Sequence, residues 1–477
     1  MQDATKHFIN GQWVNSIDGR ETAVENPSTE ERIATITLGG VADVEMAVTA
    51  AKDAFPSWAA TNPSERIAAL ERLMEVYKTR AGDMAQAISI EMGAPIALAK
   101  TAQVGAGAGH LKNTIRAAKT FVFESPLGDH APGDIILYEP VGVCALITPW
   151  NWPMNQVMLK VAPALAAGCT MILKPSELSP LSSILLAEMI DEADFPPGTF
   201  NLVNGDGANV GAHLTSHEDV DMVSFTGSTR AGVAITKSAA DTVKRVSLEL
   251  GGKGANIIFA DADEKVITRG VRHCFNNSGQ SCNAPTRMLV ERTIYDQAVE
   301  TARAVAEKTE VGPADIEGRH IGPVVSEVQF NKIQFLIKRG MDEGAKLIAG
   351  GLGRPDGLSR GYFVRPTIFA DVTQDMTIWT EEIFGPVLCI TPFDCEEEAI
   401  TLANDTSYGL TNYVQTSNNA RARRVARQLR SGMVEMNGKF SGAGSPFGGI
   451  KQSGNGREGG AWGLEEFLEV KAVSDWG

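Results

Sequence analysis

The stretch "VGVCALITPWNWPMNQVMLKVAPALAAGCTMILKPSE", residues 141–177, carries the strongest fold pattern in the chain. Its first part, VGVCALITP, is a short apolar run that predicts a buried strand. The segment NQVMLKVAPALAAG has helical period and ends in Gly168, which predicts a helix, and TMILKPSE predicts a second strand. A strand, a helix and a strand in this order are typical of parallel strands in one sheet.

The same alternation continues toward the C-terminus. Strands are predicted in TFNLVNGDG, MVSFTGS and RVSLELGGKGANIIF, with helices in SSILLAEMIDEAD, ANVGAHLTSH and RAGVAITKSAA. This order predicts an α/β fold with a doubly wound, largely parallel sheet. In such sheets ligands bind beyond the carboxyl ends of the strands, where the polar runs TPWN, KPSE, NGDG and FTGS stand.

The segments before this sheet have different patterns. Residues 52–118 show apolar residues at helical spacing, and their NPSE entry makes Ser64 a candidate helix cap. Residues 8–38 predict short strands and turns. Residues 121–140 lack helical period and end in DIILYEP, which predicts an extended hairpin.

A second α/β rhythm begins at about residue 252. Strands are predicted in TRMLVE, GPVLCITPFD, TNYVQTS and GMVEMNG, and helices in YDQAVETARAVAEK, EEEAITLAND and ARARRVARQLR. The Gly- and Pro-rich segments 349–361 and 438–460 predict loops. The C-terminal half therefore predicts a second α/β domain.

Composition excludes several classes of function. The formal net charge is -15, and the most basic stretch, 421–430, has the pattern of a solvated helix face, which argues against nucleic-acid binding. No apolar run approaches the ~18 residues of a membrane span. The N-terminus, MQDATKHFINGQW, lacks the basic-then-apolar pattern of a signal peptide, so a cytoplasmic location is expected.

Six cysteines raise the question of what their thiols do. None forms a C-x-x-C pair or stands at zinc-ligand spacing from a histidine, so no metal site is predicted. Cys144 and Cys169 lie in apolar strand patterns and are interpreted as core residues. Cys282 differs because its segment, FNNSGQSCNAP (275–285), is polar and turn-forming, which leaves an inert thiol and a nucleophile as alternatives.

Three glycine-rich segments are candidate nucleotide loops. VGAGAG (104–109) lies in a helical region and favours close helix packing. VNGDGANVG (203–211) has the strand-to-helix context of a cofactor loop, although its spacing departs from the usual fingerprint. FTGSTRAG (225–232) opens a helix after a strand, so its backbone N–H groups favour an anion, and Ser228 can cap the helix or contact a phosphate.

Four further segments belong together: TPWNWP (148–153), LELGGK (248–253), NSGQSC (277–282) and EEIFGP (381–386). With them the chain closely resembles the NAD(P)-dependent aldehyde dehydrogenase superfamily, from FINGQWV at residue 8 to EVKAV near its end. The resemblance implies an NAD-binding domain, a catalytic domain, a connecting segment and a small β oligomerisation arm. The NAD-binding domain is implied to comprise residues 1–118 and 141–251, and the catalytic domain residues 252–448. The connecting segment is implied to be 449–463, and the oligomerisation arm to comprise 119–140 and 464–477.

The resemblance also implies a chemistry that the residue types can perform. An aldehyde donates hydride readily only as a tetrahedral adduct, and a thiolate forms that adduct well and later leaves well. Cys282 matches the family's nucleophile, and its polar turn is expected to favour the thiolate. The amide of Asn151, with the Cys282 backbone N–H, matches the oxyanion donors. Glu249 matches the base for thioester hydrolysis.

Alternatives to these roles remain open at the level of sequence. Glu249 could pair with Lys253, and Asn151 could be a turn residue. Lys160 matches a lysine near the proton path of many relatives, or it is a helix-surface lysine. In those relatives a Glu after GRE-x-G assists this lysine. The corresponding position here is Ala461, which argues against a Lys160 relay and leaves Glu249 as the expected sole base.

For the cofactor, the resemblance implies that Lys174 and Glu177 contact the adenosine ribose. A carboxylate there accepts from ribose hydroxyls and repels a 2′-phosphate, so NAD is expected, with NADP as the second candidate. The other residues matched to the cofactor site are Trp150, Ser176, Gly207, Gly227, Ser228, Leu250, Glu382 and Phe384.

The substrate is expected to be a small-molecule aldehyde, medium-sized and partly apolar, whose identity the sequence does not specify. The residues implied to line its site are Trp152, Gln156, Leu159, Ser281, Asn283, Phe440 and Phe447. Ser281 and Asn283 are more polar than the usual flanks of the nucleophile. Because relatives pair a protruding hairpin with a neighbour's sheet, a homodimer or homotetramer is expected.

Three functional hypotheses follow. The first is NAD-dependent oxidation of an aldehyde to its acid. The second is a coenzyme-A-acylating semialdehyde dehydrogenase, which Glu249 disfavours because acylating members generally lack it. The third is a non-enzymatic relative, which the joint presence of Asn151, Glu249, Cys282 and Glu382 disfavours.

Overall fold

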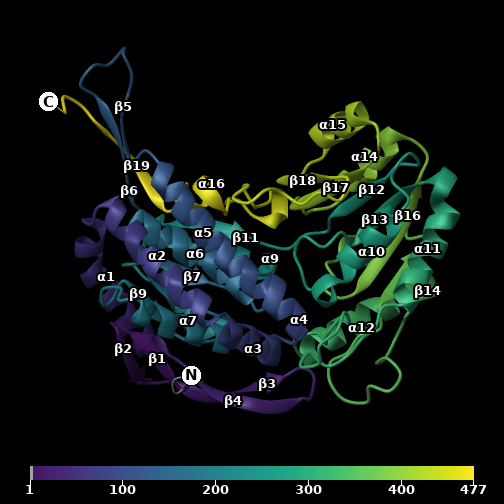
Figure 1. Ribbon diagram of the computed structural model, residues 1–477, viewed down its shortest axis with the longest axis horizontal. Helices are drawn as coiled ribbons and strands as arrows, with labels where there is room; N and C mark the ends of the chain where they lie inside the picture. The colour runs from purple at the N-terminus through teal and green to yellow at the C-terminus, as the bar shows by residue number, and fades with distance from the viewer. Residues whose placement is uncertain (1–3, 477) are drawn as a thin grey trace.

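Two seven-stranded sheets organise the computed structural model, which describes residues 4–476. The strand order is β11-β10-β7-β8-β9-β1-β2 in the first sheet and β14-β15-β16-β13-β12-β17-β18 in the second. Each sheet lies in its own lobe, with the N-terminal half in one lobe and α10 to α15 in the other (Figure 1). The predicted α/β class, with a doubly wound first sheet and a second α/β unit, is confirmed.

The first sheet is parallel except at one edge. Its parallel strands are β7 Val143–Ile147, β8 Thr170–Lys174, β9 Phe200–Leu202, β10 Met222–Thr226 and β11 Arg245–Glu249. The edge strands β1 Lys6–Ile9 and β2 Gln12–Asn15 are antiparallel. In the register Ile147 pairs with Lys174, and Thr226 pairs with Glu249, so the predicted cofactor segments follow neighbouring strand ends.

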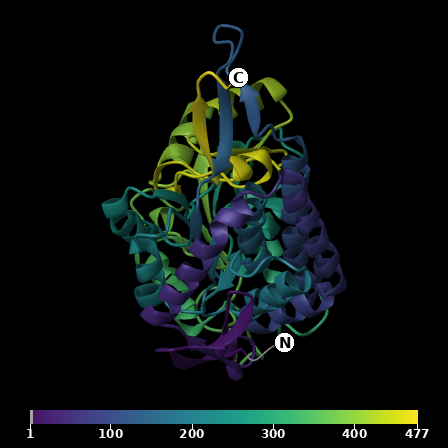
Figure 2. The same cartoon turned by 90° about the vertical axis from the view of Figure 1, so that its left-hand side faces the viewer.

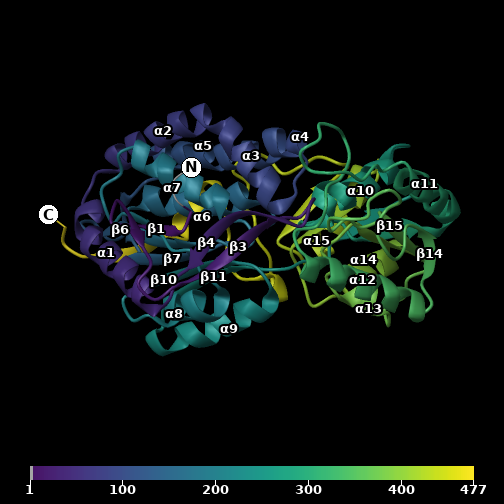
Figure 3. The same ribbon diagram turned by 90° about the horizontal axis from the view of Figure 1, so that it is seen from below.

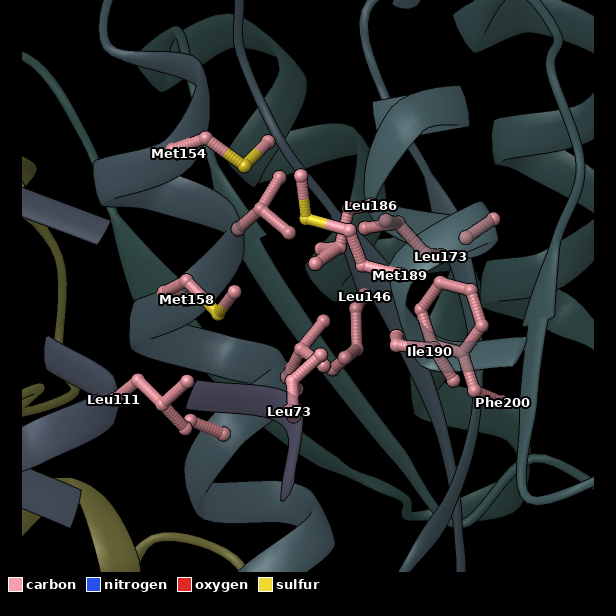
Figure 4. Close-up of a cluster of buried hydrophobic side chains, with 14 of the residues drawn as sticks. Leu73, Leu111, Leu146, Met154, Met158, Leu173, Leu186, Met189, Ile190 and Phe200 are labelled. Carbon is pink, nitrogen blue, oxygen red and sulfur yellow. The ribbon is translucent and has the colours of Figure 1, made fainter. Parts of the chain in front are cut away.

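Helices cover both faces of this sheet (Figure 3). Alternation along β7 explains this, because Cys144 and Leu146 join one buried core while Val143 and Ala145 join another. Figure 4 shows part of the first core, where Leu146 of β7 lies among side chains of the helices. The covering helices are α1 Val41–Ala59, α2 Pro63–Thr79, α3 Ala81–Met92, α5 Val104–Thr120, α6 Pro153–Ala167, α7 Leu181–Glu192, α8 Ala212–Ser216 and α9 Thr229–Ala239, with short turns α4 Ile96–Leu98, η1 Ala99–Gln103, η2 Gly207–Gly211 and η3 Ala240–Thr242.

The helix boundaries show which local patterns were informative. Helix α6 ends where predicted, because Gly168 adopts a φ of 98° and caps it. The prediction of Ser64 as the cap of α2 was wrong. Asn62 is the N-cap, Pro63 occupies the first helical position, and the Glu65 carboxylate accepts the Asn62 N–H at 2.8 Å.

The second sheet has the same construction. Its parallel strands are β12 Ala255–Ile258, β13 Arg287–Glu291, β15 Thr367–Ala370, β16 Val387–Phe393, β17 Thr411–Gln415 and β18 Met433–Met436, with antiparallel β14 Lys346–Ala349 at one edge. The accompanying helices are α10 Val266–Phe275, α11 Tyr295–Glu307, α12 Glu327–Asp342, α13 Thr377–Thr380, α14 Glu396–Asn404 and α15 Asn419–Gln428. Two separate apolar cores fill its faces.

Two smaller sheets complete the fold. Strands β5 Glu124–Pro126, β6 Ile135–Pro140 and β19 Leu468–Val473 form an antiparallel arm that projects from the first lobe (Figures 1 and 2). This arm contains the predicted hairpin, and its strand β19 follows the short helix α16 Gly460–Glu465. The ribbon of β3 Arg20–Asn26 and β4 Glu31–Leu38 reaches the second lobe, where Pro27 accepts the Tyr362 N–H.

Only residues 250–254 separate the last strand of the first sheet from β12 of the second. This short connection places the carboxyl ends of β10 and β11 opposite the second lobe. The functional names of the two domains and their exact bounds stay predictions. Within residues 4–476, no helix has the length and apolar character needed to cross a membrane.

Candidate active site

A cleft runs between the lobes at the carboxyl ends of the first sheet. Counted with its open mouth, it holds about 690 Å³ of empty space. Both lobes contribute to its walls. The lining residues are Pro149, Trp150, Asn151, Gln156, Thr226, Gly227, Ser228, Leu250, Gly251, Cys282, Gln329, Lys332, Glu382 and Phe384.

The loop before Cys282 has an uncommon backbone. Asn277, Ser278 and Gly279 have φ values of 51°, 56° and 72°, in the left-handed region. Such non-glycine conformations cost roughly 1–3 kcal/mol each and persist where contacts impose them. Here the Ser278 hydroxyl donates to the Gly322 carbonyl at 2.7 Å. A side chain at position 279 would collide with the Gly385 carbonyl, so glycine is required there.

Cys282 lies in a short half-buried segment between buried residues. Ser281, Cys282 and Asn283 are half-buried, whereas Gln280 and Ala284 on either side are buried. The prediction that this turn favours the thiolate was wrong for the protein without ligands. Burial raises the pKa of Cys282, and carboxylates that come from distant parts of the chain, led by Glu382, raise it further. The thiol is therefore neutral until a ligand or base acts on it.

Two N–H groups near the thiol are available to a ligand. Asn151 uses one amide hydrogen to donate to the Gln280 carbonyl at 3.0 Å. Its own carbonyl accepts from the Asn277 amide at 2.9 Å, which fixes the residue beside the loop. The second Asn151 amide hydrogen and the Cys282 backbone N–H have no acceptor within the described chain. The arrangement can therefore present paired donors to an oxygen bound at Cys282.

Glu249 ends β11 with 3% of its surface exposed. Neither carboxyl oxygen has a hydrogen-bond partner among the described residues. Burial raises the pKa of Glu249 well above its usual range, and the nearby Glu458 carboxylate raises it further. The alternative of a pair with Lys253 was wrong, because the Lys253 ammonium donates to the Glu381 carbonyl at 2.7 Å.

Lys160 has a buried carboxylate partner, so Ala461 does not by itself argue against a Lys160 relay. Its ammonium forms an ion pair with Glu458, and the two side chains are 1% and 6% exposed. Glu458 is held by backbone hydrogen bonds in both directions with Phe447, at 2.7 and 2.8 Å. Glu458 stands three residues before Ala461, in the GRE segment itself. Lys160 is likewise buried in α6, so it is not a helix-surface lysine.

The start of α9 forms one end of the cleft. Ser228 caps the helix by accepting the Ala231 N–H at 3.3 Å, as one of its two predicted roles required. Thr226, next to it, has a buried hydroxyl without a partner in residues 4–476. A helix N-terminus with an unpaired hydroxyl suits the pyrophosphate of a dinucleotide. Gly227 lies between them, where a Cβ would collide with the Phe225 ring.

The predicted ribose residues lie at the carboxyl end of β8 and just after it, and they are not among the residues that line the cleft. The Lys174 ammonium donates to the carbonyls of Pro175 and Gly205, at 2.9 and 2.7 Å, and lies 3.9 Å from a Glu177 carboxylate oxygen. The Ser176 hydroxyl accepts the Leu178 N–H at 3.2 Å.

Gly207 begins the π-helical turn that follows β9. A Cβ at this position would meet nothing within 4 Å, so the space above it is open to a ligand.

The opposite wall of the cleft comes from the second lobe. A Glu382 carboxylate oxygen accepts the Gly252 N–H at 2.8 Å, and the Lys332 ammonium donates to the Glu382 carbonyl at 2.9 Å. The Gln329 amide donates to the Phe384 carbonyl at 2.8 Å. The rings of Phe384 and Trp150 meet edge to face, with centroids 5.5 Å apart. Leu250 completes the cofactor residues that line the cleft.

Sequence reasoning missed Gln329 and Lys332. They lie one turn apart on α12, whose pattern is that of an ordinary amphipathic helix. What marks these two residues is their contact with the segment EEIFGP in the folded chain. The sequence alone gives no sign of that contact.

The predicted substrate residues separate into groups. The Trp152 indole N–H donates to the Ser281 hydroxyl at 2.7 Å, and Asn283 accepts the Tyr413 hydroxyl at its carbonyl, at 2.5 Å. Gln156 lines the cleft itself. The others are Leu159, which is buried and does not line the cleft, Phe440, which is 75% exposed, and Phe447, which is half-buried beside Glu458.

One group of possible metal ligands lies outside the cleft, where Glu45 of α1 meets His213 and His217. His217 accepts the Asp219 N–H at its Nδ1 atom, at 3.0 Å. Its proton therefore sits on Nε2, which donates to Glu45. This arrangement fits a hydrogen-bonded trio rather than an ion site.

The fold and site together define a class: an α/β protein with a dinucleotide-type cleft whose wall holds a half-buried thiol beside two N–H donors and buried carboxyls. Comparison with known proteins is more specific. Residues 13–473 match the model of the aldehyde dehydrogenase family. The chain belongs to the aldehyde dehydrogenase family.

Individual relatives cover the whole chain. A 3-succinoylsemialdehyde-pyridine dehydrogenase from a Pseudomonas species is 52% identical over 475 residues, which are 99% of each chain. The crystal structure of an aldehyde dehydrogenase from Bartonella henselae is 58% identical, with a TM-score of 0.99 and full coverage of both chains. A Pseudomonas syringae aldehyde dehydrogenase C mutant, solved with NAD⁺ and octanal, is 46% identical with a TM-score of 0.98, covering 100% of this chain and 97% of the other.

Proposed function

We propose that the protein oxidises an uncharged or weakly polar aldehyde to the carboxylic acid, with NAD as the hydride acceptor. The observation that carries the proposal is the position of Cys282 in the wall of the cleft, beside two unused N–H donors and near the buried Glu249. The test is an NADH-formation screen across aliphatic, aromatic, amino- and carboxy-aldehydes, with the acid identified as product. Absence of NADH with every aldehyde would contradict the proposal.

The first half of the reaction uses Cys282 and Asn151. Loss of the thiol proton to water or a nearby carboxylate leaves a thiolate, whose sulfur adds to the carbonyl carbon. The oxygen takes the negative charge and receives hydrogen bonds from the Asn151 amide and the Cys282 N–H. When bound, NAD supplies the hydride acceptor. Collapse of the adduct with loss of hydride leaves an acyl thioester on Cys282.

The second half uses Glu249. As a carboxylate it removes one proton from water, and the water oxygen attacks the thioester carbon. The C–S bond then breaks, and the Cys282 sulfur takes the remaining proton of the new carboxylic acid, which departs as the carboxylate. We place the buried Lys160–Glu458 pair on the path that returns the proton of Glu249 to solvent. The support is that Glu458 is close enough to raise the pKa of Glu249.

NAD is preferred over NADP in this proposal because of Glu177. Its side chain is 40% exposed, 3.9 Å from Lys174, so it is free to accept from ribose hydroxyls and to repel a 2′-phosphate. We expect Glu177→Gln to shift the ratio of kcat/KM for NAD over NADP toward NADP by about tenfold, or about 1.4 kcal/mol. Steady-state kinetics with both cofactors measure this. An unchanged ratio, equal to that of the control Glu192→Gln at the far end of α7, would contradict it.

The arm of β5, β6 and β19 supports a homodimer or homotetramer. Val470 on β19 is 62% exposed, on a sheet whose β5 and β19 edges pair with no other strand in residues 4–476. Open edges are commonly paired with another chain. Light scattering should give a mass of two or four chains of 50.9 kDa. Val470→Lys should lower that mass, and a monomeric wild-type protein would contradict the proposal.

A further inference from the structure

Cys282 stands at the corner of a tight turn. The Ala284 N–H donates to the Ser281 carbonyl at 3.0 Å, which closes a β-turn around Cys282 and Asn283. Beyond the thiol, the Tyr413 hydroxyl donates to the Asn283 carbonyl at 2.5 Å. In the described part of the chain, no other side chain hydrogen-bonds to the backbone of the turn on that side of the thiol. The position of this side of the turn therefore depends on Tyr413.

Tyr413 is itself fixed by the second sheet. It lies on β17, where it pairs with Asn256 of β12 on one side and with Glu435 of β18 on the other. Tyr413 is 3% exposed, and its ring meets the His273 ring edge to face, with centroids 5.2 Å apart. Burial raises the pKa of the Tyr413 phenol well above its usual range, so the hydroxyl keeps its proton and acts as a donor. A buried strand thus presents a fixed donor to a turn that lies 130 residues earlier in the chain.

The turn also packs on the backbone of Gly252. A Cβ at this glycine would lie 2.4 Å from the Cys282 carbonyl oxygen, so the peptide that joins Cys282 to Asn283 faces Gly252 with its carbonyl. Because a trans peptide is planar, with its N–H opposite its C=O, the Asn283 N–H is directed away from Gly252. Two contacts therefore hold the turn, one at the Cys282 carbonyl and the other, from Tyr413, at the next carbonyl.

The direction of the Asn283 N–H affects the charge state of the thiol. Burial raises the pKa of Cys282, and the carboxyls of Glu382, Glu249 and Glu458 raise it further. A hydrogen bond from the Asn283 N–H acts in the opposite direction, because it stabilises the negative charge of the thiolate. Hydrogen bonds weaken steeply as they bend, so a small rotation of the turn would weaken this one.

We propose that Tyr413 is a positioning residue of the nucleophile: by donating to the Asn283 carbonyl, its hydroxyl holds the turn so that the Asn283 N–H stays directed at the Cys282 sulfur. The proposal rests on the proposed function, in which Cys282 is the nucleophile, and adds a residue that the chemical steps do not use. Tyr413 is not among the residues that line the cleft, so it acts through Asn283 without touching aldehyde or cofactor.

Tyr413→Phe tests this, because it keeps the ring against His273 and removes only the hydroxyl. With the Asn283 N–H no longer held, less thiolate should be present at each pH. Iodoacetamide should alkylate Cys282 in the folded protein about three- to tenfold more slowly than in wild type between about pH 6 and 9, the effect of one hydrogen bond. The mass of the Cys282 peptide measures this. The first-turnover NADH burst should slow by about ten- to a hundredfold, while KM for NAD stays within about twofold.

Tyr77→Phe is the matched control. Tyr77 is 1% exposed on α2, and its hydroxyl donates to the Val104 carbonyl at 3.1 Å, away from the residues that line the cleft. Both variants lose one hydroxyl and one hydrogen bond to a backbone carbonyl, so their thermal midpoints should fall by similar amounts. Only Tyr413→Phe should change the alkylation rate and the burst.

A merely structural role for Tyr413 predicts the opposite change in alkylation, since a loosened turn exposes the thiol. Alkylation of Tyr413→Phe at or above the wild-type rate, or equal slowing in Tyr77→Phe, would overturn the proposal. Alkylation requires neither aldehyde nor NAD. If no aldehyde yields NADH, the proposed function fails, while the alkylation rates still decide the role of Tyr413.

Discussion

Cys282→Ala is expected to lower aldehyde-dependent NADH formation by about 10⁴-fold or more, because the covalent adduct forms on the Cys282 sulfur in this mechanism. The change removes one sulfur atom from a half-buried position, so the cleft and the rest of its lining should be unaffected. NAD binding, measured by calorimetry, should stay within a few-fold of wild type. The loss should therefore appear in turnover and not in cofactor affinity.

Cys274→Ala is the matched control. Cys274 is also a cysteine with a pKa raised by burial, but it lies in α10, where its thiol faces the Val387 carbonyl at 3.7 Å. This variant should retain near wild-type turnover after allowance for stability. Appreciable turnover in Cys282→Ala, or an equal loss in Cys274→Ala, would exclude the thiol mechanism as proposed.

Glu249→Gln is expected to separate the two halves of the reaction. The first turnover should still release NADH in a burst, because Cys282, Asn151 and the cofactor cleft are unchanged. Steady-state turnover should fall by about 10²- to 10⁴-fold, the usual contribution of a general base. Stopped-flow absorbance of NADH measures both phases, and full steady-state turnover would show that another base acts.

The role of Glu249 also predicts how the rate of thioester hydrolysis changes with pH. Glu249 has a raised pKa, so it is protonated at pH values where an exposed glutamate is ionised. Only the carboxylate can accept a proton from water, so the hydrolysis rate should rise with pH through that pKa. Glu249→Gln should lose this rise. Glu466→Gln, a nearby carboxyl with a raised pKa that accepts the Arg457 N–H, should keep it.

The same variant distinguishes the coenzyme-A hypothesis. If the acyl group normally passes to coenzyme A, adding that thiol should restore turnover to Glu249→Gln and produce an acyl thioester in solution. We expect coenzyme A to have no effect on wild type and free acid to be the product. Product analysis by mass spectrometry decides between them.

The fold could be predicted largely because its strongest elements are local. The strand of Val143–Ile147 is a continuous apolar run, and α6 ends at a glycine in the left-handed conformation. Such features depend on a few adjacent residues. The cap of α2 shows the limit, since Asn62 and Ser64 are both good caps and only the position of Pro63 in the folded helix separates them.

The site was predictable in its residues but not in its electrostatics. Cys282, Glu249 and Asn151 follow from motifs, whereas the raised pKa of Cys282 comes from burial and from carboxylates distant in the sequence. The Lys160–Glu458 pair joins residues 298 positions apart. The spacing of the motif points to position 461 for the carboxylate partner of Lys160. In the folded chain that partner is Glu458.

The central claim is that the aldehyde becomes an acyl thioester on Cys282. It is tested most directly by mixing Glu249→Gln with aldehyde and NAD, quenching in acid, and measuring the mass of the peptide that contains Cys282. The account predicts an added mass equal to the aldehyde less H₂, present only when NAD is included. An unmodified Cys282 peptide after an NADH burst, or an acyl group on another residue, would contradict it.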